Sequence, residues 1–192
     1  MTVAGDLIRA EEIDRLVCDA YRSLASPAGA ATWLYSDEQL ASLPEGARDW
    51  ALGVGNPVPH AELHAGETVL DLGCGAGIDV LLAAAQVGPG GSVIGLDVLS
   101  EMVERGHRFA AEAGFDSVKF LEGKMDAIPL PDESVDVVIS NGAINLAARK
   151  SRVLAEAFRV LRPGGRLCVA DLTIVEDDIP PQILTHPSAW AG

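Results

Sequence analysis

One short segment constrains the fold of this chain more than any other. The run Thr-Val-Leu-Asp-Leu at residues 68–72 is followed by glycines at alternate positions, Gly73, Gly75 and Gly77. A short apolar run that ends in glycines predicts a buried strand, a tight turn and the start of a helix. In open parallel sheets, ligands bind outside the carboxyl ends of the strands. The segment therefore predicts both a fold class and the place of a ligand site.

Strand and helix patterns alternate from this segment onward. Short runs rich in valine, isoleucine and leucine alternate with longer stretches of helical periodicity, which indicates β-α-β units. The predicted strands are 68–72, 92–97, 117–122, 135–140 and 166–171, and the predicted helices are 78–87, 100–113 and 150–161. This order predicts an α/β protein with a Rossmann-like parallel sheet of about five strands and helices on both faces.

The length of 192 residues fits one α/β domain. We expect residues 67–172 to form the core and residues 1–66 to form an N-terminal helical cover, with an amphipathic helix at 6–24 and short helices joined by turns at 26–59. The proline-containing segment 173–192 is expected to be a short irregular tail.

Charge and cysteine content narrow the class of protein. The net charge of −14 disfavours binding to nucleic acid, although it also serves solubility alone. The three cysteines, Cys18, Cys74 and Cys168, form no Cys-x-x-Cys pair, so we expect no disulfide framework and no metal site, and we expect Cys18 and Cys168 to be buried. The N-terminus resembles neither a signal peptide nor a membrane anchor. We therefore expect a cytoplasmic protein that does not bind membranes.

The residues around the glycines indicate the chemistry of the ligand. A dinucleotide-binding loop needs its third glycine one residue later, where this chain has Ile78. Asp71, just before the turn, would repel a pyrophosphate but attract a protonated amino group. Asp97 ends the next strand and can accept hydrogen bonds from both hydroxyls of a ribose. A cationic nucleoside fits this combination; the alternative is a tight turn without a ligand.

On these motifs, residues 67–171 resemble the class I S-adenosylmethionine-dependent methyltransferases, including the turn at 161–167 before the fifth strand. The resemblance implies S-adenosylmethionine as cofactor, with the acidic-glycine motif at its methionine part, Asp97 at the ribose, and Met102 and residues 124–126 at the adenine. Lys124 replaces an acid found in many relatives and cannot accept a hydrogen bond from the adenine amino group. The predicted cofactor-binding residues are Asp71, Gly73, Cys74, Gly75, Gly77, Asp97, Val98, Met102, Lys124, Met125, Asp126 and Asn141.

Within this class, three regions look most like arsenite methyltransferases: 35–47, 53–57 and 140–146. The resemblance implies arsenic-binding cysteines at positions where this chain has Val54 and Gly142, with a third beyond residues 189–192. Thiolates suit a soft, thiophilic centre. Because these thiols are absent from the chain, the sequence does not identify the molecule that accepts the methyl group.

Three functions remain open. The chain is an active methyltransferase of a small molecule, a silent cofactor-binding relative that serves as a regulatory or partner subunit, or an arsenic enzyme that uses other thiols. Transfer from a sulfonium mainly requires alignment and exclusion of water, so no catalytic base is predicted. Aromatic residues Trp33, Tyr35 and Trp50 either line the acceptor site or pack the cover, and His60 and His64 either line its mouth or lie on the surface.

The fifth strand is predicted to lie at a sheet edge. The resemblance implies two further strands, which we expect to be missing here. An exposed edge strand can pair with another chain. We therefore expect either a homodimer through this edge or an N-terminal segment that covers it.

Overall fold

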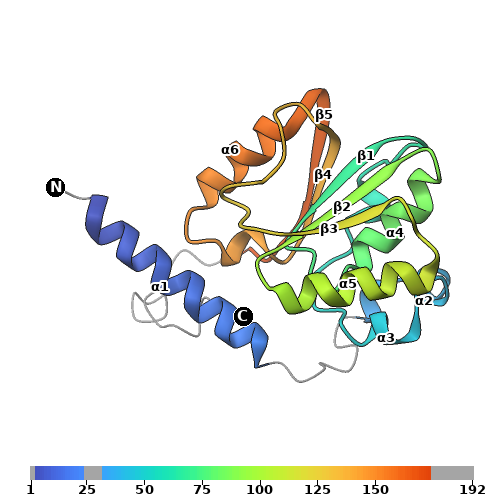
Figure 1. Cartoon of the computed structure of the whole chain (residues 1–192), viewed down its shortest axis with the longest axis horizontal. Helices are drawn as coiled ribbons and strands as arrows, with labels where there is room; N and C mark the ends of the chain where they lie inside the picture. Colours follow the sequence, from blue (N-terminus) through green and yellow to red (C-terminus); the bar gives the residue numbers. More distant parts are fainter. Residues whose placement is uncertain (1–2, 24–31, 174–192) are drawn as a thin grey trace.

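The computed structural model describes residues 3–23 and 32–173. Its centre is a five-stranded sheet in the order β3-β2-β1-β4-β5, and all four neighbouring pairs are parallel. The strands are β1 (Thr68–Leu72), β2 (Ser92–Asp97), β3 (Val118–Glu122), β4 (Val135–Asn141) and β5 (Leu161–Ala170). The predicted Rossmann-like α/β fold is confirmed (Figure 1).

Helices cover both faces of the sheet. Helices α4 (Ile78–Val87) and α5 (Ser100–Ala113) pack on one face, and α6 (Lys150–Val160) packs on the other. Alternate residues of β1 serve the two cores: Val69 packs toward α4, whereas Leu70 contributes to the cluster beneath α6. Burial on both faces explains why the strands are almost continuously apolar.

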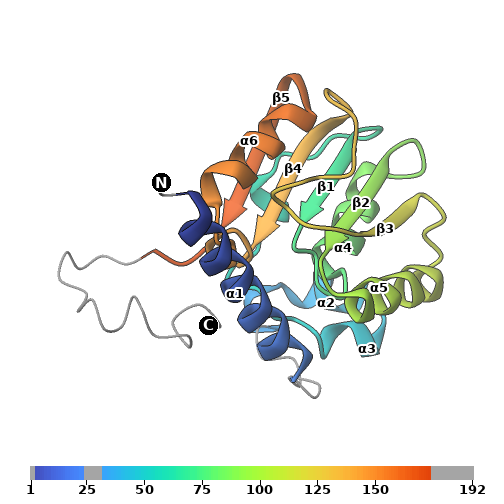
Figure 2. The ribbon, with the colours of Figure 1, turned by 60° about the vertical axis from the view of Figure 1, so that its left-hand side comes forward.

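The N-terminal region folds into helices beside the carboxyl ends of the strands. It contains α1 (Val3–Arg22), η1 (Thr32–Leu34), α2 (Asp37–Ala41), α3 (Glu45–Arg48), η2 (Val58–His60). Figure 2 shows α1 lying across the end of the sheet at which the strand arrows point. Helix α2 begins at a capping box, in which Ser36 and Gln39 satisfy each other's backbone N–H groups. The predicted tail lies outside the described residues apart from its first position, 173.

Strand β5 begins earlier than the sequence indicates. A turn at 161–167 and a strand from Arg166 were expected, but α6 ends at Val160 and β5 begins at Leu161. The pairing with β4 shifts between Val135 and Val137, whose partners are Leu161 and Arg166. The turn-forming glycines are therefore absorbed as an irregularity within the strand, and the prediction of a separate turn is wrong.

Ion pairs fasten the amino ends of the strands. Arg166 on β5 forms a two-pronged contact with Glu67, with both N···O distances 2.7 Å, and its Nε donates to the carbonyl of Ala61 at 2.6 Å. Arg162 contacts Asp136 at 2.6 Å. Hydrogen bonds from Arg166 lower the pKa of Glu67 to about 2. We call Glu67–Arg166 and Asp136–Arg162 the amino-end pairs.

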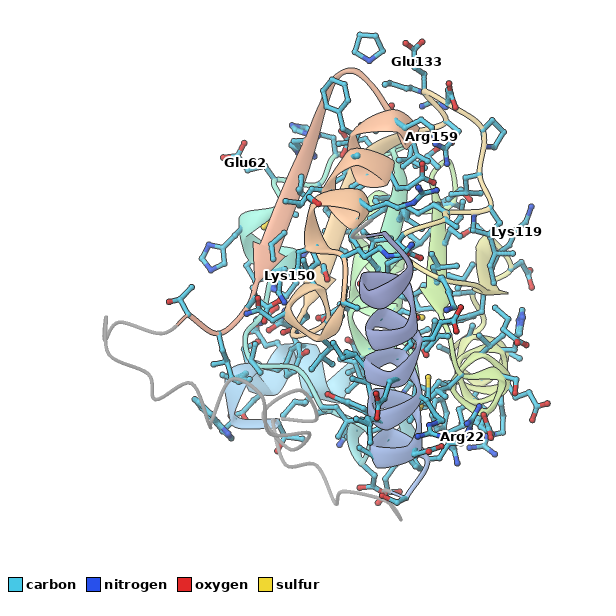
Figure 3. All side chains as sticks on the ribbon, turned by 90° about the vertical axis from the view of Figure 1, so that its left-hand side faces the viewer. Arg22, Glu62, Lys119, Glu133, Lys150 and Arg159 are labelled. Carbon is cyan, nitrogen blue, oxygen red and sulfur yellow. The ribbon has the colours of Figure 1, made fainter. Side chains whose placement is uncertain are left out.

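The loop before β4 is held from α6. Arg159 donates to the carbonyls of Ile128 and Leu130 and contacts the carboxylates of Asp132 and Glu156 at 2.8 and 2.7 Å (Figure 3). This contact fixes the crossover from β3 to β4 against the sheet.

Within the part of the chain that the structure describes, no helix is long and apolar enough to cross a membrane.

Candidate functional site

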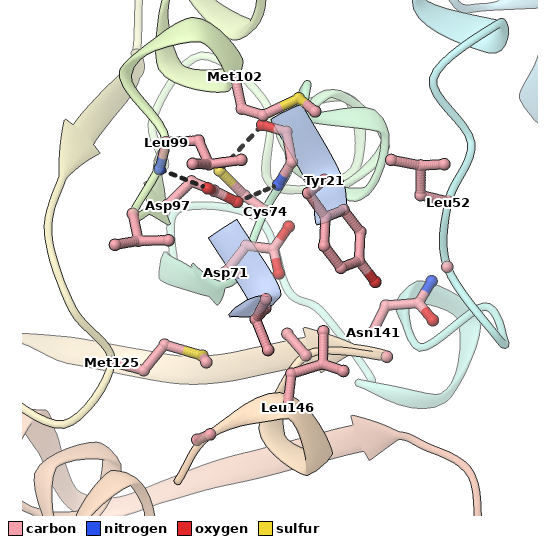
Figure 4. Close-up of a pocket in the computed structure, with 18 of the residues that line it drawn as sticks. Tyr21, Leu52, Asp71, Cys74, Asp97, Leu99, Met102, Met125, Asn141 and Leu146 are labelled. Carbon is pink, nitrogen blue, oxygen red and sulfur yellow. Dashed lines mark hydrogen bonds between the residues drawn. The ribbon is translucent and has the colours of Figure 1, made fainter. Parts of the chain in front are cut away.

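A cavity opens at the carboxyl ends of β1, β2 and β4, beneath α1. It holds about 1250 Å³ of space free of atoms, part of which is open to solvent. Its walls come from α1, residues 35 and 50–53, the glycine loop, the ends of β2 and β4, and the loops after β3 and β4 (Figure 4). This is the location expected for a ligand in a doubly wound sheet.

The glycine loop forms the floor of the cavity. The N–H groups of Gly73 and Cys74 donate to the carbonyl of Leu96 at 2.8 and 3.1 Å, which ties the loop to β2. A Cβ at position 73 would lie 2.3 Å from that of Ala143, so only glycine fits there. At Gly75, where φ is +53°, a Cβ would meet nothing within 4 Å. The backbone at Gly75 is thus open to close approach by a ligand.

Gly77 differs from the other two glycines. It precedes α4 with φ +91°, and a Cβ there would lie 2.6 Å from the ring of Phe120 on β3. It does not line the cavity. Its glycine is required by the packing of the helix start against the sheet, and its contact with the cofactor stays a prediction.

Asp97 sits at the end of β2 and braces the site. Its Oδ2 accepts from the N–H of Gly75 at 2.9 Å, and its Oδ1 accepts from the N–H of Leu99 at 2.9 Å (Figure 4). Burial raises the pKa of Asp97, and these backbone donors oppose the rise. Each oxygen retains a lone pair for a further donor, which fits the expected contact with ribose hydroxyls.

Asp71 is the least satisfied polar residue in the site. It is only 2% exposed, it lines the cavity, and its Oδ1 has no hydrogen-bond partner. Burial raises the pKa of Asp71 well above its ordinary value, and the nearby Asp79 and Asp97 raise it further. An unpartnered buried carboxyl oxygen costs free energy. A positively charged hydrogen-bond donor in the cavity would relieve that cost.

A buried network that was not predicted lies beside Asp71. Asp79, in the first turn of α4, accepts from the hydroxyl of Tyr35 at 3.1 Å and from the side-chain amide of Asn141 at 2.9 Å. The same amide donates to the carbonyl of Gly55 at 2.7 Å, and its oxygen accepts from the N–H of Val54 at 2.9 Å. Asn141 therefore joins β4, α4 and the loop 53–55.

The residues predicted to lie near the adenine line the cavity together, and their contact with the adenine stays a prediction. Val98, Met102, Met125 and Asp126 all contribute to its wall. Lys124 also lines it, but its Nζ contacts Asp14 of α1 at 2.6 Å. The lysine thus links α1 to the loop after β3, a role that the sequence did not suggest.

The cavity brings together eleven of the twelve predicted residues, all except Gly77. Sequence reasoning missed Tyr21, Leu52, Asp79 and Leu146, which also line it. Of these four residues, only Asp79 could have been found from the sequence, because it is an acid two positions after the last glycine of the loop. Cys18 and Cys168 were expected to be buried; both pack against the core but are partly exposed, and Cys18 also lines the cavity.

The other side chains raised as candidates separate into two groups. Tyr35 and Trp50 line the cavity, whereas Trp33 is 79% exposed and belongs neither to a wall nor to a core. Neither His60 nor His64 lines the cavity. The described residues contain no group of three or more His, Cys, Asp or Glu side chains placed to hold a metal ion.

The two internal positions implied for arsenic-binding thiols lie next to each other. A Cβ placed at Gly142 would be 3.3 Å from a methyl group of Val54. The loops at 53–57 and 140–146 thus meet at one edge of the cavity, as their shared resemblance requires. At that edge this chain presents a valine and a glycine.

Comparisons with known proteins agree with this architecture. A family profile described as "Methyltransferase domain" matches residues 63–191. An arsenite methyltransferase of Halobacterium salinarum is 44% identical over 158 residues, which are 82% of this chain and 40% of that protein. A demethylmenaquinone methyltransferase of Symbiobacterium thermophilum is 39% identical over 57% of this chain and 44% of its own length.

Among solved structures, an arsenic (III) S-adenosylmethionine methyltransferase from Chlamydomonas reinhardtii superposes with a TM-score of 0.71. It is 36% identical, and the match covers 79% of this chain and 53% of that one. The chain spans about half or less of the length of these relatives.

Proposed function

Because the chain belongs to the class I S-adenosylmethionine-dependent methyltransferases, we propose that its cavity binds S-adenosylmethionine and directs methyl transfer to a small molecule. The cofactor supplies a methyl group that is already activated by its sulfonium. The chain's residues bind the cofactor, align the acceptor and exclude water. Asp71, Gly73, Cys74, Gly75, Asp97, Val98, Met102, Lys124, Met125, Asp126 and Asn141 are the proposed cofactor-binding residues.

The single observation that carries this proposal is the unpartnered oxygen of Asp71. It lies on a cavity floor whose backbone is open at Gly75, and Asp97 stands at the other end of the same floor. An ammonium group satisfies the first carboxyl and a ribose the second. A nucleoside that carries an amino acid group has both features, whereas a pyrophosphate would be repelled by the two carboxyls.

The acceptor side of the cavity supports an acceptor that is not held by thiolates. The wall of the cavity includes Tyr21, Tyr35, Trp50 and Leu52, and the neighbouring positions Val54 and Gly142 carry no sulfur. Aromatic walls suit an apolar or cationic acceptor. Because the positions implied for arsenic-binding thiols are Val54 and Gly142 in this chain, we propose a small organic acceptor rather than arsenite.

Calorimetric titration with S-adenosylmethionine and its demethylated product tests the binding step. We expect both to bind at one site per chain. Incubation with methyl-labelled cofactor and a panel of small aromatic, amine and thiol acceptors then tests transfer. Arsenite with glutathione serves as the arm for an arsenic enzyme, and we expect no methylated arsenic from it. Absence of binding would reject the proposal.

A silent cofactor-binding subunit is the second candidate. It predicts binding with the same stoichiometry and no turnover with any acceptor. The features that support cofactor binding support it equally, and the acceptor panel separates the two functions.

We also propose that the edge of β5 mediates self-association. Within the described residues, β5 pairs only with β4, and its Leu167 and Val169 are exposed. Such an edge can pair with a second copy. Sedimentation is expected to show a dimer, and a monomer at high micromolar concentration would contradict it.

The three unpaired cysteines support the expected cytoplasmic location.

A further inference from the structure

Three buried carboxyl groups meet at the floor of the cavity with no cation to balance them. Asp71, Asp79 and Asp97 line it, and in the described part of the chain none of the three has a lysine or arginine within ion-pair distance. The two cations of the wall are committed to other acids: Lys124 contacts Asp14 at 2.6 Å, and Arg149 contacts Asp126 at 4.0 Å.

The three acids are satisfied to different degrees. Both oxygens of Asp97 accept backbone N–H groups, and the two oxygens of Asp79 accept from Tyr35 and Asn141. These donors stabilise the charged form of each carboxylate. Oδ1 of Asp71 has no donor. Among three adjacent acids, Asp71 is thus the one whose neutral form the surroundings favour.

We propose that Asp71 carries a proton in the empty cavity and that binding of an ammonium-bearing nucleoside drives this proton into solvent. This inference rests on the proposed function, because it assumes that the ligand of this cavity carries an amino group. The balance is simple: neutral Asp71 loses its proton to water, and its carboxylate then accepts a hydrogen bond from the ligand's ammonium.

Four titratable groups lie around Asp71, and two of them, Asp79 and Asp97, raise its pKa. Asp79 faces it from α4, Asp97 from β2, Cys74 from the glycine loop and Tyr35 from the cover. The first two raise the pKa of Asp71 through their charges, in addition to the larger effect of burial. Burial raises the pKa of Asp79 to about 6. Asp71 therefore keeps its proton to a higher pH than a free carboxyl does.

Calorimetry of the full chain measures the proton directly. Binding of S-adenosylhomocysteine at pH 6.5 is followed in buffers of different ionisation enthalpy, and the dependence of the heat on the buffer gives the number of protons released. We expect about one, since the ligand's own amino group stays protonated at this pH. We expect methylthioadenosine, which lacks the amino acid part, to bind with no proton release.

Two variants sharpen the measurement. Asp71→Asn removes the carboxyl group that carries this proton. S-adenosylhomocysteine is therefore expected to bind at least tenfold more weakly and with no proton released. Asp132→Asn removes an acid that contacts Arg159 far from the cavity, and we expect it to leave the proton count at one. The comparison of the two ligands on the unaltered protein remains decisive if Asp71→Asn does not fold.

The outcomes separate this inference from the proposed function. Binding of S-adenosylhomocysteine without proton release overturns the inference and leaves cofactor binding intact. Equal release with methylthioadenosine also overturns it, because the proton would then come from elsewhere. If neither ligand binds, the proposed function fails and the inference fails with it.

Discussion

The two ends of the sheet treat their acidic residues in opposite ways. At the amino ends, Glu67 and Asp136 lie against arginines at 2.6–2.7 Å, and hydrogen bonds from Arg166 lower the pKa of Glu67. At the carboxyl ends, Asp71 and Asp79 are buried without a cation, and burial raises the pKa of both. The first arrangement stabilises the folded chain, whereas the second leaves buried carboxyl groups without a positively charged partner.

This difference assigns separate tasks to the two ends. Acids that are paired within the chain contribute to folding, and acids that lack a partner lower the stability of the empty protein in favour of a ligand. Exchanging an acid for its neutral analogue should therefore change stability in opposite directions at the two ends. The four substitutions below test this comparison, from the largest expected effect to the smallest.

Asp97→Ala should have the largest effect. It removes both the expected ribose contact and the acceptor that holds the N–H groups of Gly75 and Leu99. Hydrogen bonds to a charged group contribute about 1.5–3 kcal/mol each, so we expect S-adenosylhomocysteine to bind about 100-fold more weakly by calorimetry. Circular dichroism provides the control that the variant folds. An affinity within threefold of the unaltered protein would exclude Asp97 from the site.

Glu67→Gln tests the amino end. We expect the free energy of unfolding at pH 7 to fall by about 2 kcal/mol, because the two-pronged contact with Arg166 is lost. The pKa of Glu67 is lowered, so its contribution is complete above its ordinary pKa of 4.5 and is lost as the pH falls toward about 2. Urea unfolding measures the change. Ligand affinity should remain within about threefold, and a large loss of affinity would contradict the division of tasks.

Asp71→Asn should act in the opposite direction on the empty protein. The raised pKa of Asp71 means that the folded state binds its proton more tightly than the unfolded state, so stability falls as the pH rises above the ordinary carboxyl value of 3.8. We expect the free energy of unfolding of the variant to be about 1 kcal/mol higher at pH 8. We also expect this free energy to vary less with pH between 4 and 8. Thermal unfolding without ligand measures both, and destabilisation at pH 8 would refute the prediction.

Lys124→Met should have the smallest effect. The Lys124–Asp14 contact is short, but the lysine side chain is 52% exposed, and exposed pairs contribute about 0–1 kcal/mol. We expect a change of less than about 0.5 kcal/mol in the free energy of unfolding, which diminishes further in 0.5 M salt. A loss above about 1.5 kcal/mol would mean that α1 is held to the core mainly through this pair.

The sheet and the cavity floor were predictable because their signals are local. Apolar runs mark the strands, and a glycine loop between Asp71 and Asp97 needs only the neighbouring strand to make sense. Strand β5 began five residues early because the glycines near Gly164, where φ is +84°, form an irregularity in a strand rather than a turn. Composition alone does not distinguish these two uses of glycine.

The Tyr35–Asp79–Asn141 network was not predictable, because its members come from three segments that are 44 and 62 residues apart. Each residue is unremarkable in its own context, and the network exists only once the residue after η1, α4 and β4 have packed. Trp33 shows the converse: its aromatic ring suggested a wall, yet it points to solvent. Periodicity predicts burial, but it does not predict which cavity a side chain faces.

The bonds from Asn141 to the loop 53–55 also bear on how this protein can change over evolution. A Cβ at Gly53 would lie 2.2 Å from the side-chain amide nitrogen of Asn141, and one at Gly55 would lie 2.6 Å from the Cβ of Ala170, so both positions require glycine. Val54 between them is held only through its backbone N–H, and its side chain is 36% exposed. Residue 54 can therefore be replaced without strain on its glycine neighbours, while the backbone of the loop and its bonds to Asn141 stay unchanged.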